Sequence, residues 1–334
     1  VIEVRNQLAA ESAFSLGPLA VGPRPVPMEV LTALRTASRD DNPRVRLEAV
    51  YAFGVLASEP GGERRRELLR TSAPDLAAMM GAIDAAQRYA ALRVIARVFE
   101  RRAQDEPVDQ GLGDAVVSAL NEKDAPMRAA AMQALGAMRY ERALQALLDL
   151  FQYFGKGELA FVALDAVAHI GHGAVVPQML SQLASKDLAL RLIAIEGLAR
   201  SGDRSKLADI QAALRTERND ALLLGGNFAA FMLSGGGDSV RLLNPLVAAL
   251  GKPRLREQAR AYLAEAAAGQ PEAFGRYLAD PDGNVRVDLI EALGLGGNTS
   301  ALSVLNGLPP DRDMQVGRAL EQALARLRQV RPAA

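Results

Sequence analysis

Apolar residues recur along this chain at helical spacing, and one frame of apolar and polar positions returns roughly every thirty to forty residues. The clearest copies cover residues 41–54 (DNPRVRLEAVYAFG), 124–136 (DAPMRAAAMQALG) and 282–294 (DGNVRVDLIEALG). Each copy has an acidic residue, a short loop, an apolar residue, an arginine, and then small residues at fixed offsets. A repeat of this length predicts a solenoid, in which each copy packs against its sequence neighbours.

The arginine of the frame sets the register, so we name it the marker arginine and the helix predicted around it the marker helix. Positions −1, +3, +6 and +7 from the marker lie on one side of a helix and carry small or aliphatic residues, which predicts that this side is the core stripe. Aspartates just before the marker are expected at the helix N-cap or in its first turn. The markers are Arg46, Arg88, Arg128, Arg191, Arg256 and Arg286, with Ala163 and Gly317 at the same place in two divergent copies and a weak copy within 220–236.

A second helical segment precedes most marker helices, over 28–38, 112–120, 143–154, 174–183, 206–214, 240–250 and 301–308. The alternating runs of Val, Thr and aromatic residues that predict strands are almost absent. We therefore predict an all-α protein, an α-solenoid of about eight to nine stacked helical hairpins. It is expected to occupy 28–330 as a single unit, after an irregular leader over 1–27 and before a short tail over 331–334.

Composition narrows the function classes. Lys and Arg together number 39, as do Asp and Glu, and this balance argues against a dedicated binder of nucleic acid or anionic membranes. Without cysteine, the chain has no disulfide and no thiolate metal ligand. The longest uncharged run, 221–237, is interrupted by glycines, so no membrane span is expected. The chain begins at Val1, so an N-terminal piece is expected to be missing and the compartment stays open.

Motifs that carry chemistry are missing or weak. Asp165, His169 and His172 have the spacing of metal ligands on one helix face, but Gly171 is expected to end that helix, which favours a packed His169. The glycine clusters lack the lysine and preceding strand of a phosphate loop. Neither a Gly-x-Ser-x-Gly elbow nor a His-Glu-x-x-His zinc motif occurs. We therefore predict no catalytic, metal or cofactor-binding residue.

The frame resembles the HEAT-like repeat, in the bacterial subtype first noted in phycobilin lyases; 282–294 and 41–54 are its closest copies. The resemblance implies that the marker helices line a concave face and their partner helices a convex face. It also implies a ladder of loop aspartates and marker arginines between neighbouring repeats, interrupted at Ala163 and Gly317. The residues expected in this ladder are Asp41, Asp124, Asp187 and Asp282, with Arg46, Arg128, Arg191 and Arg286.

If the marker helices line a groove, offsets +1, +2, +5 and +9 point into it, and these positions supply the candidate binding residues. One end of the groove is then aromatic and basic and the other acidic, which favours a protein or peptide partner over a uniform polyanion. A charged face that only keeps the solenoid soluble is the alternative. The candidate residues are Tyr51, Tyr89, Arg93, Arg97, Glu196, Arg200, Glu257, Glu265, Asp288 and Glu291.

The leading hypothesis is a non-enzymatic scaffold or assembly subunit that binds a protein or peptide partner, with no nucleic acid. The alternative is an enzyme or enzyme subunit of phycobilin-lyase type that acts on a cofactor-carrying protein. Membership of a larger assembly stays open, because repeat proteins can associate through uncapped ends.

Overall fold

The structure is a computed structural model that describes residues 28–57, 73–99, 108–236 and 238–328. Every regular element in these ranges is helical, which confirms the predicted all-α class. The chain divides into two compact units, Val1–Ala166 and Val167–Ala334, and the division falls inside α9 (Glu158–Ile170). The leader and the tail lie outside the described residues, and one continuous solenoid over 28–330 stays a prediction.

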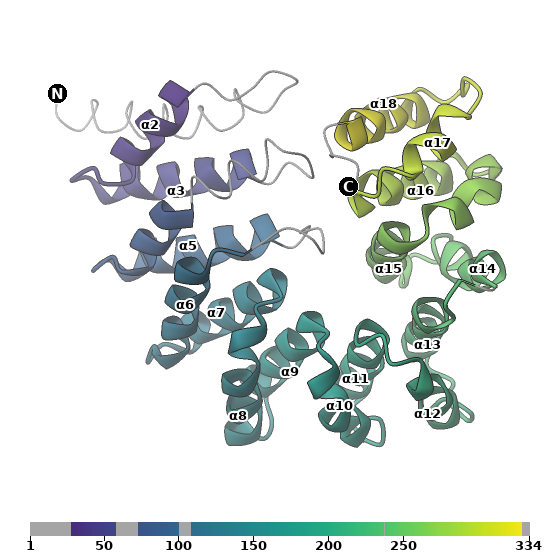
Figure 1. The fold of residues 1–334 in the computed structure, drawn as a ribbon, viewed down its shortest axis with the longest axis horizontal. Helices are drawn as coiled ribbons and strands as arrows, with labels where there is room; N and C mark the ends of the chain where they lie inside the picture. Colours follow the sequence, from purple (N-terminus) through teal and green to yellow (C-terminus); the bar gives the residue numbers. More distant parts are fainter. Residues whose placement is uncertain (1–27, 58–72, 100–107, 237, 329–334) are drawn as a thin grey trace. The chain divides into compact units, whose positions relative to one another are not determined.

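In the first unit the marker helices form one layer, in which α3 packs on α5 and α5 on α7 (Figure 1). The partner helices form the second layer. The marker layer contains α3 (Pro43–Ala57), α5 (Ala85–Phe99), α7 (Ala125–Met138) and the first part of α9. The partner layer contains α2 (Met28–Ala37), the helical residues 73–80, α6 (Gln110–Ser118) with η1 (Ala119–Asn121), and η2 (Glu141–Ala143) with α8 (Leu144–Phe154).

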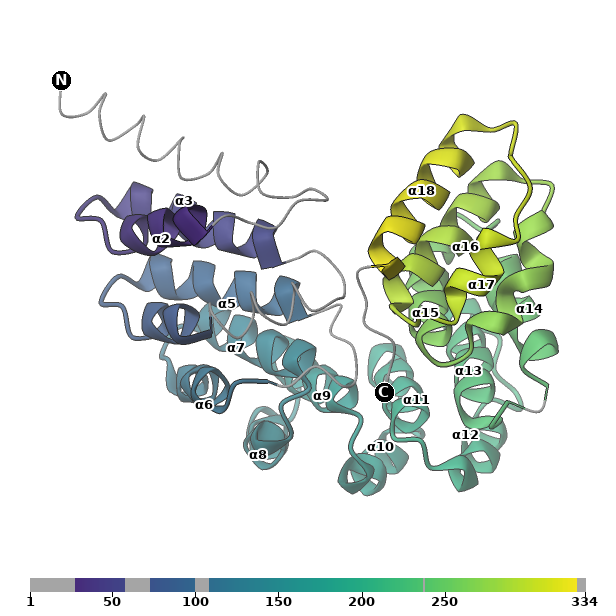
Figure 2. The same ribbon diagram turned by 45° about the horizontal axis from the view of Figure 1, so that its top comes forward.

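The second unit repeats this arrangement: α11 packs on α13, α15 on α16, and α16 on α18 (Figure 2). Its marker layer contains α11 (Leu188–Arg200), α13 (Asp220–Leu233), α15 (Arg256–Gly269), α16 (Gly283–Gly296) and α18 (Met314–Arg328). Its partner elements are η3 (Gly173–Val175), α10 (Val176–Gln182), η4 (Arg204–Lys206), α12 (Leu207–Ala213), α14 (Ser239–Ala249), η5 (Pro271–Ala279) and α17 (Ala301–Asn306).

The predicted core stripe is confirmed by burial. Small residues along it bring neighbouring marker helices close together. A Cβ added to Gly136 would lie 2.9 Å from the Cα of Ala166, and one added to Gly294 would lie 2.9 Å from the Cβ of Ala323. The buried alanines three positions after the marker are Ala49, Ala91, Ala131, Ala166, Ala194 and Ala259.

Three of the loop aspartates have a role different from the predicted ladder. Asp124, Asp187 and Asp282 are N-caps of α7, α11 and α16, and each carboxylate accepts a hydrogen bond from a backbone N–H of the first turn. A cap of this kind stabilises a helix by about 1 kcal/mol. Each cap uses one carboxylate oxygen, and the direct partners of the marker arginines are other side chains.

The marker arginines do form a ladder, with side chains of the following hairpin as its acceptors. Arg88 Nε donates to Glu122 over 2.9 Å, and Arg286 Nε donates to Asp311 over 2.8 Å. The latter bond raises the pKa of Arg286 and lowers that of Asp311. The remaining contacts of this ladder are Arg46 with Gln87 and Asp84, Arg191 with Glu217, and Arg256 with Asp288.

A second contact ties some marker arginines to their own loops. The Nη1 atoms of Arg46, Arg88 and Arg286 donate to backbone carbonyls five and six residues upstream, at distances between 2.6 and 3.2 Å. One guanidinium therefore satisfies its own loop and the next hairpin, which fixes the register between the two.

Tyr140 fixes the α6 hairpin against the end of α7. Its hydroxyl donates to Asp114 Oδ1 over 2.6 Å, and this bond lowers the pKa of Asp114. The ring lies against Gly113, where an added Cβ would come within 2.4 Å of it. Burial, and then the bond to Asp114, raises the pKa of Tyr140 from 10.0 to about 12.

We expect this tyrosine to make the protein lose stability in strong alkali. Because its pKa is higher in the folded than in the unfolded chain, its contribution is complete below pH 10.0 and is lost as the pH rises to about 12. Urea unfolding on both sides of this window measures the loss. Tyr140→Phe should make the free energy of unfolding depend less on pH in this window. If the variant shows the same pH dependence as the wild type, Tyr140 is not its cause.

Candidate functional site

The aromatic and basic residues predicted at one end of the groove lie on the exposed side of the marker layer in the first unit. We name Tyr51, Tyr89, Arg93 and Arg97 the tyrosine–arginine patch. Tyr51 lies on α3 and is 44% exposed, and Tyr89 on α5 is 38% exposed. Arg93 and Arg97 follow Tyr89 at successive i+4 positions of α5 and are also exposed.

One hydrogen bond between α5 and α7 fixes the register of the patch. Tyr51, Arg93 and Gln133 each stand five positions after a marker, on α3, α5 and α7. Arg93 Nη1 donates to Gln133 Oε1 over 2.8 Å, so equal offsets on α5 and α7 do face each other. Since α3 packs on α5, Tyr51 continues this row on the third helix.

The patch carries unbalanced positive charge. Within the described ranges no carboxylate forms an ion pair with Arg93 or Arg97. Arginine and tyrosine are enriched in the residues that contribute most to protein–protein binding. An arginine can also stack on an aromatic face. The patch therefore has the composition of a contact surface.

The acidic end of the predicted groove is different in the structure. Asp288 is 3% exposed, where the sequence analysis placed it on the open face. It accepts from Arg256 Nε over 2.9 Å and lies 3.6 Å from Arg260 Nε. The bond to Asp288 raises the pKa of Arg256. The prediction failed because the +2 side of α16 faces α15, so this carboxylate belongs to the interface between two helices.

Two further acids of that stretch are neutralised within the molecule. Glu291 accepts from Arg260 over 2.8 Å, and Glu265 accepts from Arg200. Glu257, with a side chain that is 87% exposed, keeps its carboxylate in solvent, 3.9 Å from Arg260. The second unit therefore does not present the continuous acidic surface that the sequence predicted.

Arg200 is the centre of a buried ionic network, in which Glu196 and Glu265 are the acids. Its side chain is 9% exposed, and its Nε and Nη2 donate to the two oxygens of Glu265 over 2.9 and 2.8 Å. Nη1 lies 3.4 Å from Glu196. Burial alone lowers the pKa of Arg200, but Glu265 and then Glu196 outweigh it and raise the pKa above its ordinary value. The contact joins α11 to α15 past the intervening α13.

Two stacked rings complete the network. Phe228 on α13 and Tyr262 on α15 stack with centroids 4.3 Å apart and planes 10° from parallel. The Tyr262 hydroxyl donates to Glu196 and accepts from Gln258 Nε2 over 2.8 Å. Burial, and then the Glu196 carboxylate, raises the pKa of Tyr262. Every polar group here has a partner inside the fold, so the network is structural.

The other candidate features take ordinary places in the described fold. His172 is the N-cap of η3, where its Nδ1 accepts from the Ala174 N–H over 3.1 Å. In the described residues no three His, Asp or Glu side chains gather as a metal site would require. A surface depression by α10 and α12 includes the Arg191–Glu217 ion pair in its lining. None of the described helices combines the length and apolar character needed to cross a bilayer.

Comparisons with known proteins agree with this architecture. The HEAT repeat family matches residues 30–59. No curated protein matches the sequence. Among solved structures, the chain is similar to an engineered protein from the Northeast Structural Genomics Consortium, with 20% identity, 97% of this chain and 96% of that chain covered, and a TM-score of 0.47. That structural likeness is too weak to carry an argument. The residues that the family model matches fall on the hairpin of α2 and α3, one of the stacked helical hairpins of the described structure.

Proposed function

We propose that this HEAT-like protein is a non-enzymatic scaffold or assembly subunit, and that it binds a protein or peptide partner through the tyrosine–arginine patch. The observation that carries the proposal is the exposed row of Tyr51, Tyr89 and two arginines without carboxylate partners in the described residues. HEAT repeats commonly mediate protein–protein contacts, which supports the same function. Each hairpin adds surface to a stack, so such folds suit extended contacts.

Tyrosine and arginine supply the binding energy that such a contact needs. A tyrosine ring contributes a large contact area with few rotatable bonds, and a guanidinium can bind a carboxylate through two hydrogen bonds. Because the cationic side chains lie beside the rings, the fitting partner is a segment with acidic and apolar residues. The bacterial phycobilin-lyase subtype is supported by the frame of the repeat alone.

The test is affinity capture from the native source with three baits: the wild type, Tyr51→Ala/Tyr89→Ala/Arg93→Ala, and a control with Leu188→Ala/Arg241→Ala/Met314→Ala. The control residues are exposed and lie outside the patch. A partner of the patch should be recovered at least about tenfold less by the first variant and equally by the control, because loss of hot-spot residues costs 2 kcal/mol or more.

Equal recovery by all three baits would exclude the patch as the binding site. Bound pigment in the purified chain, or transfer of a bilin to an acceptor protein, would replace the scaffold proposal by the lyase-type alternative. Binding of the purified chain to DNA or RNA that falls steeply with salt would instead indicate a nucleic-acid partner.

A further inference from the structure

One contact of the arginine ladder is vacant. Five marker arginines place their guanidinium against a side-chain oxygen of the following hairpin, and four of these acceptors are hydrogen-bonded carboxylates: Glu122, Glu217, Asp288 and Asp311. Arg128 on α7 is the exception. Its Nε is buried without a hydrogen-bond partner, and no carboxylate in the described ranges pairs with it.

The Arg128 guanidinium lies against an aromatic ring in place of an acid. Its central carbon is 5.2 Å from the centroid of Phe154, at the end of α8. Of its three nitrogens, Nε alone is enclosed, so the outer edge of the guanidinium can be reached from solvent. A cation–π contact offsets part of the cost of the missing partner, but it leaves the N–H donors of a charged group unused.

The sequence explains the vacancy. Glu122 and Asp311 stand six residues before the marker places Arg128 and Gly317, and Gly157 stands at this offset before Ala163. In the weak copy, Leu223 takes the marker place, four residues after the N-cap Asn219, and Glu217 stands six residues before it. Gly157 has a φ of 87°, and a Cβ built on it would meet no atom within 4 Å. The acid that Arg128 would have used is therefore absent, and the place that its side chain would occupy is open.

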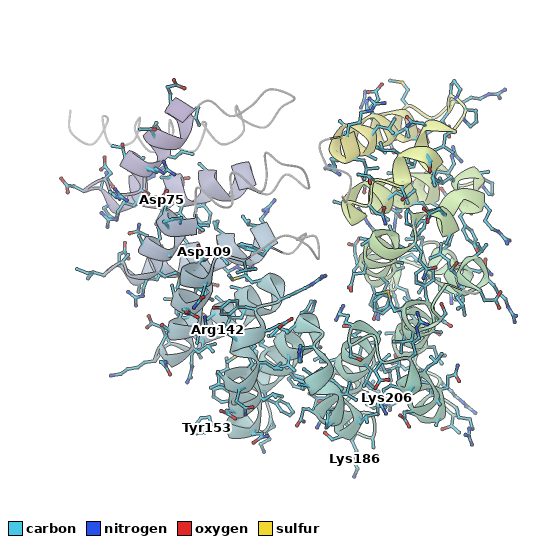
Figure 3. The ribbon with its side chains drawn as sticks, in the orientation of Figure 1. Asp75, Asp109, Arg142, Tyr153, Lys186 and Lys206 are labelled. Carbon is cyan, nitrogen blue, oxygen red and sulfur yellow. The ribbon has the colours of Figure 1, made fainter. Side chains whose placement is uncertain are left out.

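The surroundings favour an incoming acidic group. Lys156 is exposed next to Gly157, and Tyr153 is 80% exposed at the end of α8, where Figure 3 labels it. The rings of Tyr153 and Phe154 are 5.2 Å apart in an edge-to-face arrangement. Lys156 thus adds a second cation next to Gly157 in the sequence, and Phe154 links the exposed ring of Tyr153 to Arg128.

We propose that the vacant ladder position at Arg128 binds a carboxylate side chain from an acidic segment of a protein partner. The occupant is a carboxylate because carboxylates of this chain pair with the guanidinium of four other marker arginines. The outer nitrogens of Arg128 would donate to its oxygens, and Tyr153 would contact the adjoining residue. This inference rests on the proposed partner-binding function, although it does not depend on the tyrosine–arginine patch.

The test follows the Nε–H signals of ¹⁵N-arginine-labelled protein during titration with tetraglutamate, acetylated and amidated at its ends so that only side-chain carboxylates remain. Tetraglutamine of the same form is the matched probe. Arg128→Gln assigns the signal of Arg128, and Arg88→Gln assigns a filled ladder position. Both peptides are added until the Arg128 signal shifts. Tetraglutamate should cause the shift at a concentration at least about tenfold lower than tetraglutamine, because an ionised acceptor bonds more strongly than a neutral amide.

The Arg88 signal should not move, since Glu122 already occupies that guanidinium. Arg128→Gln should also leave the thermal midpoint unchanged, whereas Arg88→Gln should lower it. An Arg128 signal that moves no more than that of the exposed Arg241 would overturn the proposal, as would a larger response to inorganic phosphate than to tetraglutamate. The variant Tyr51→Ala/Tyr89→Ala/Arg93→Ala should give the same Arg128 response as the wild type. A result against binding at Arg128 can therefore be told apart from a result against binding at the tyrosine–arginine patch.

Discussion

Arg200→Met is expected to lower the free energy of unfolding by about 3–5 kcal/mol, because it leaves two partly buried carboxylates without their cation. Glu265 loses both of its hydrogen bonds to the guanidinium, and Glu196 keeps its bond from the Tyr262 hydroxyl. Urea unfolding followed by circular dichroism measures the effect. Methionine retains much of the apolar stem, so the loss reports the charge and its hydrogen bonds.

The matched control is Arg241→Met, on a side chain that is 86% exposed, and it should change the same free energy by less than about 0.5 kcal/mol. Adding Glu265→Leu to Arg200→Met should recover part of the loss, since the carboxylate that has lost the guanidinium is then removed. If Arg200→Met behaved like the exposed control, the ionic network would not hold α11 to α15.

Phe228→Ala is expected to cost about 3–5 kcal/mol of the free energy of unfolding, because a fully buried ring leaves a cavity that its neighbours fill only in part. The lost ring also removes the stack with Tyr262 and the surface over which Arg200 lies at 5.9 Å. Comparison of the urea midpoints of the variant and the wild type checks the magnitude.

Phe228→Leu serves as the conservative variant and should cost clearly less, since it keeps most of the buried volume. Tyr153→Ala, on an exposed ring, should leave the midpoint nearly unchanged. A loss below about 1 kcal/mol for Phe228→Ala would contradict the packing described for α13 and α15.

The fold could be predicted from the sequence because its determinants are local and repeated. Small residues at fixed offsets from the marker allow close approach of one helix to the next, as at Gly136 and Gly294. The segment 271–279 was not predicted as a partner helix. It forms η5, a 3₁₀ helix that begins at Pro271 and contains Gly275, and neither residue gives a helical signal.

The site could be predicted in part. The offsets placed Tyr51 and Tyr89 on an exposed side, since exposure follows from position on one helix. They did not indicate which charges neutralise each other, because these pairs join separate hairpins. Arg200 and Glu265 are 65 residues apart, and α13 lies between their helices in the chain. One signal was overlooked: Glu122, Glu217 and Asp311 share the same offset before the next marker place.

The bond from Arg200 to Glu265 joins hairpins that are not neighbours along the chain. In a stack held only by contacts between adjacent hairpins, one hairpin can open with little effect on its next-nearest neighbour. Here α13 cannot separate from α15 without disturbing α11, because the guanidinium, the two carboxylates and the stacked rings are one network. Amide protons of these three helices should therefore exchange as one cooperative block, and fraying that starts at α18 should halt at α15.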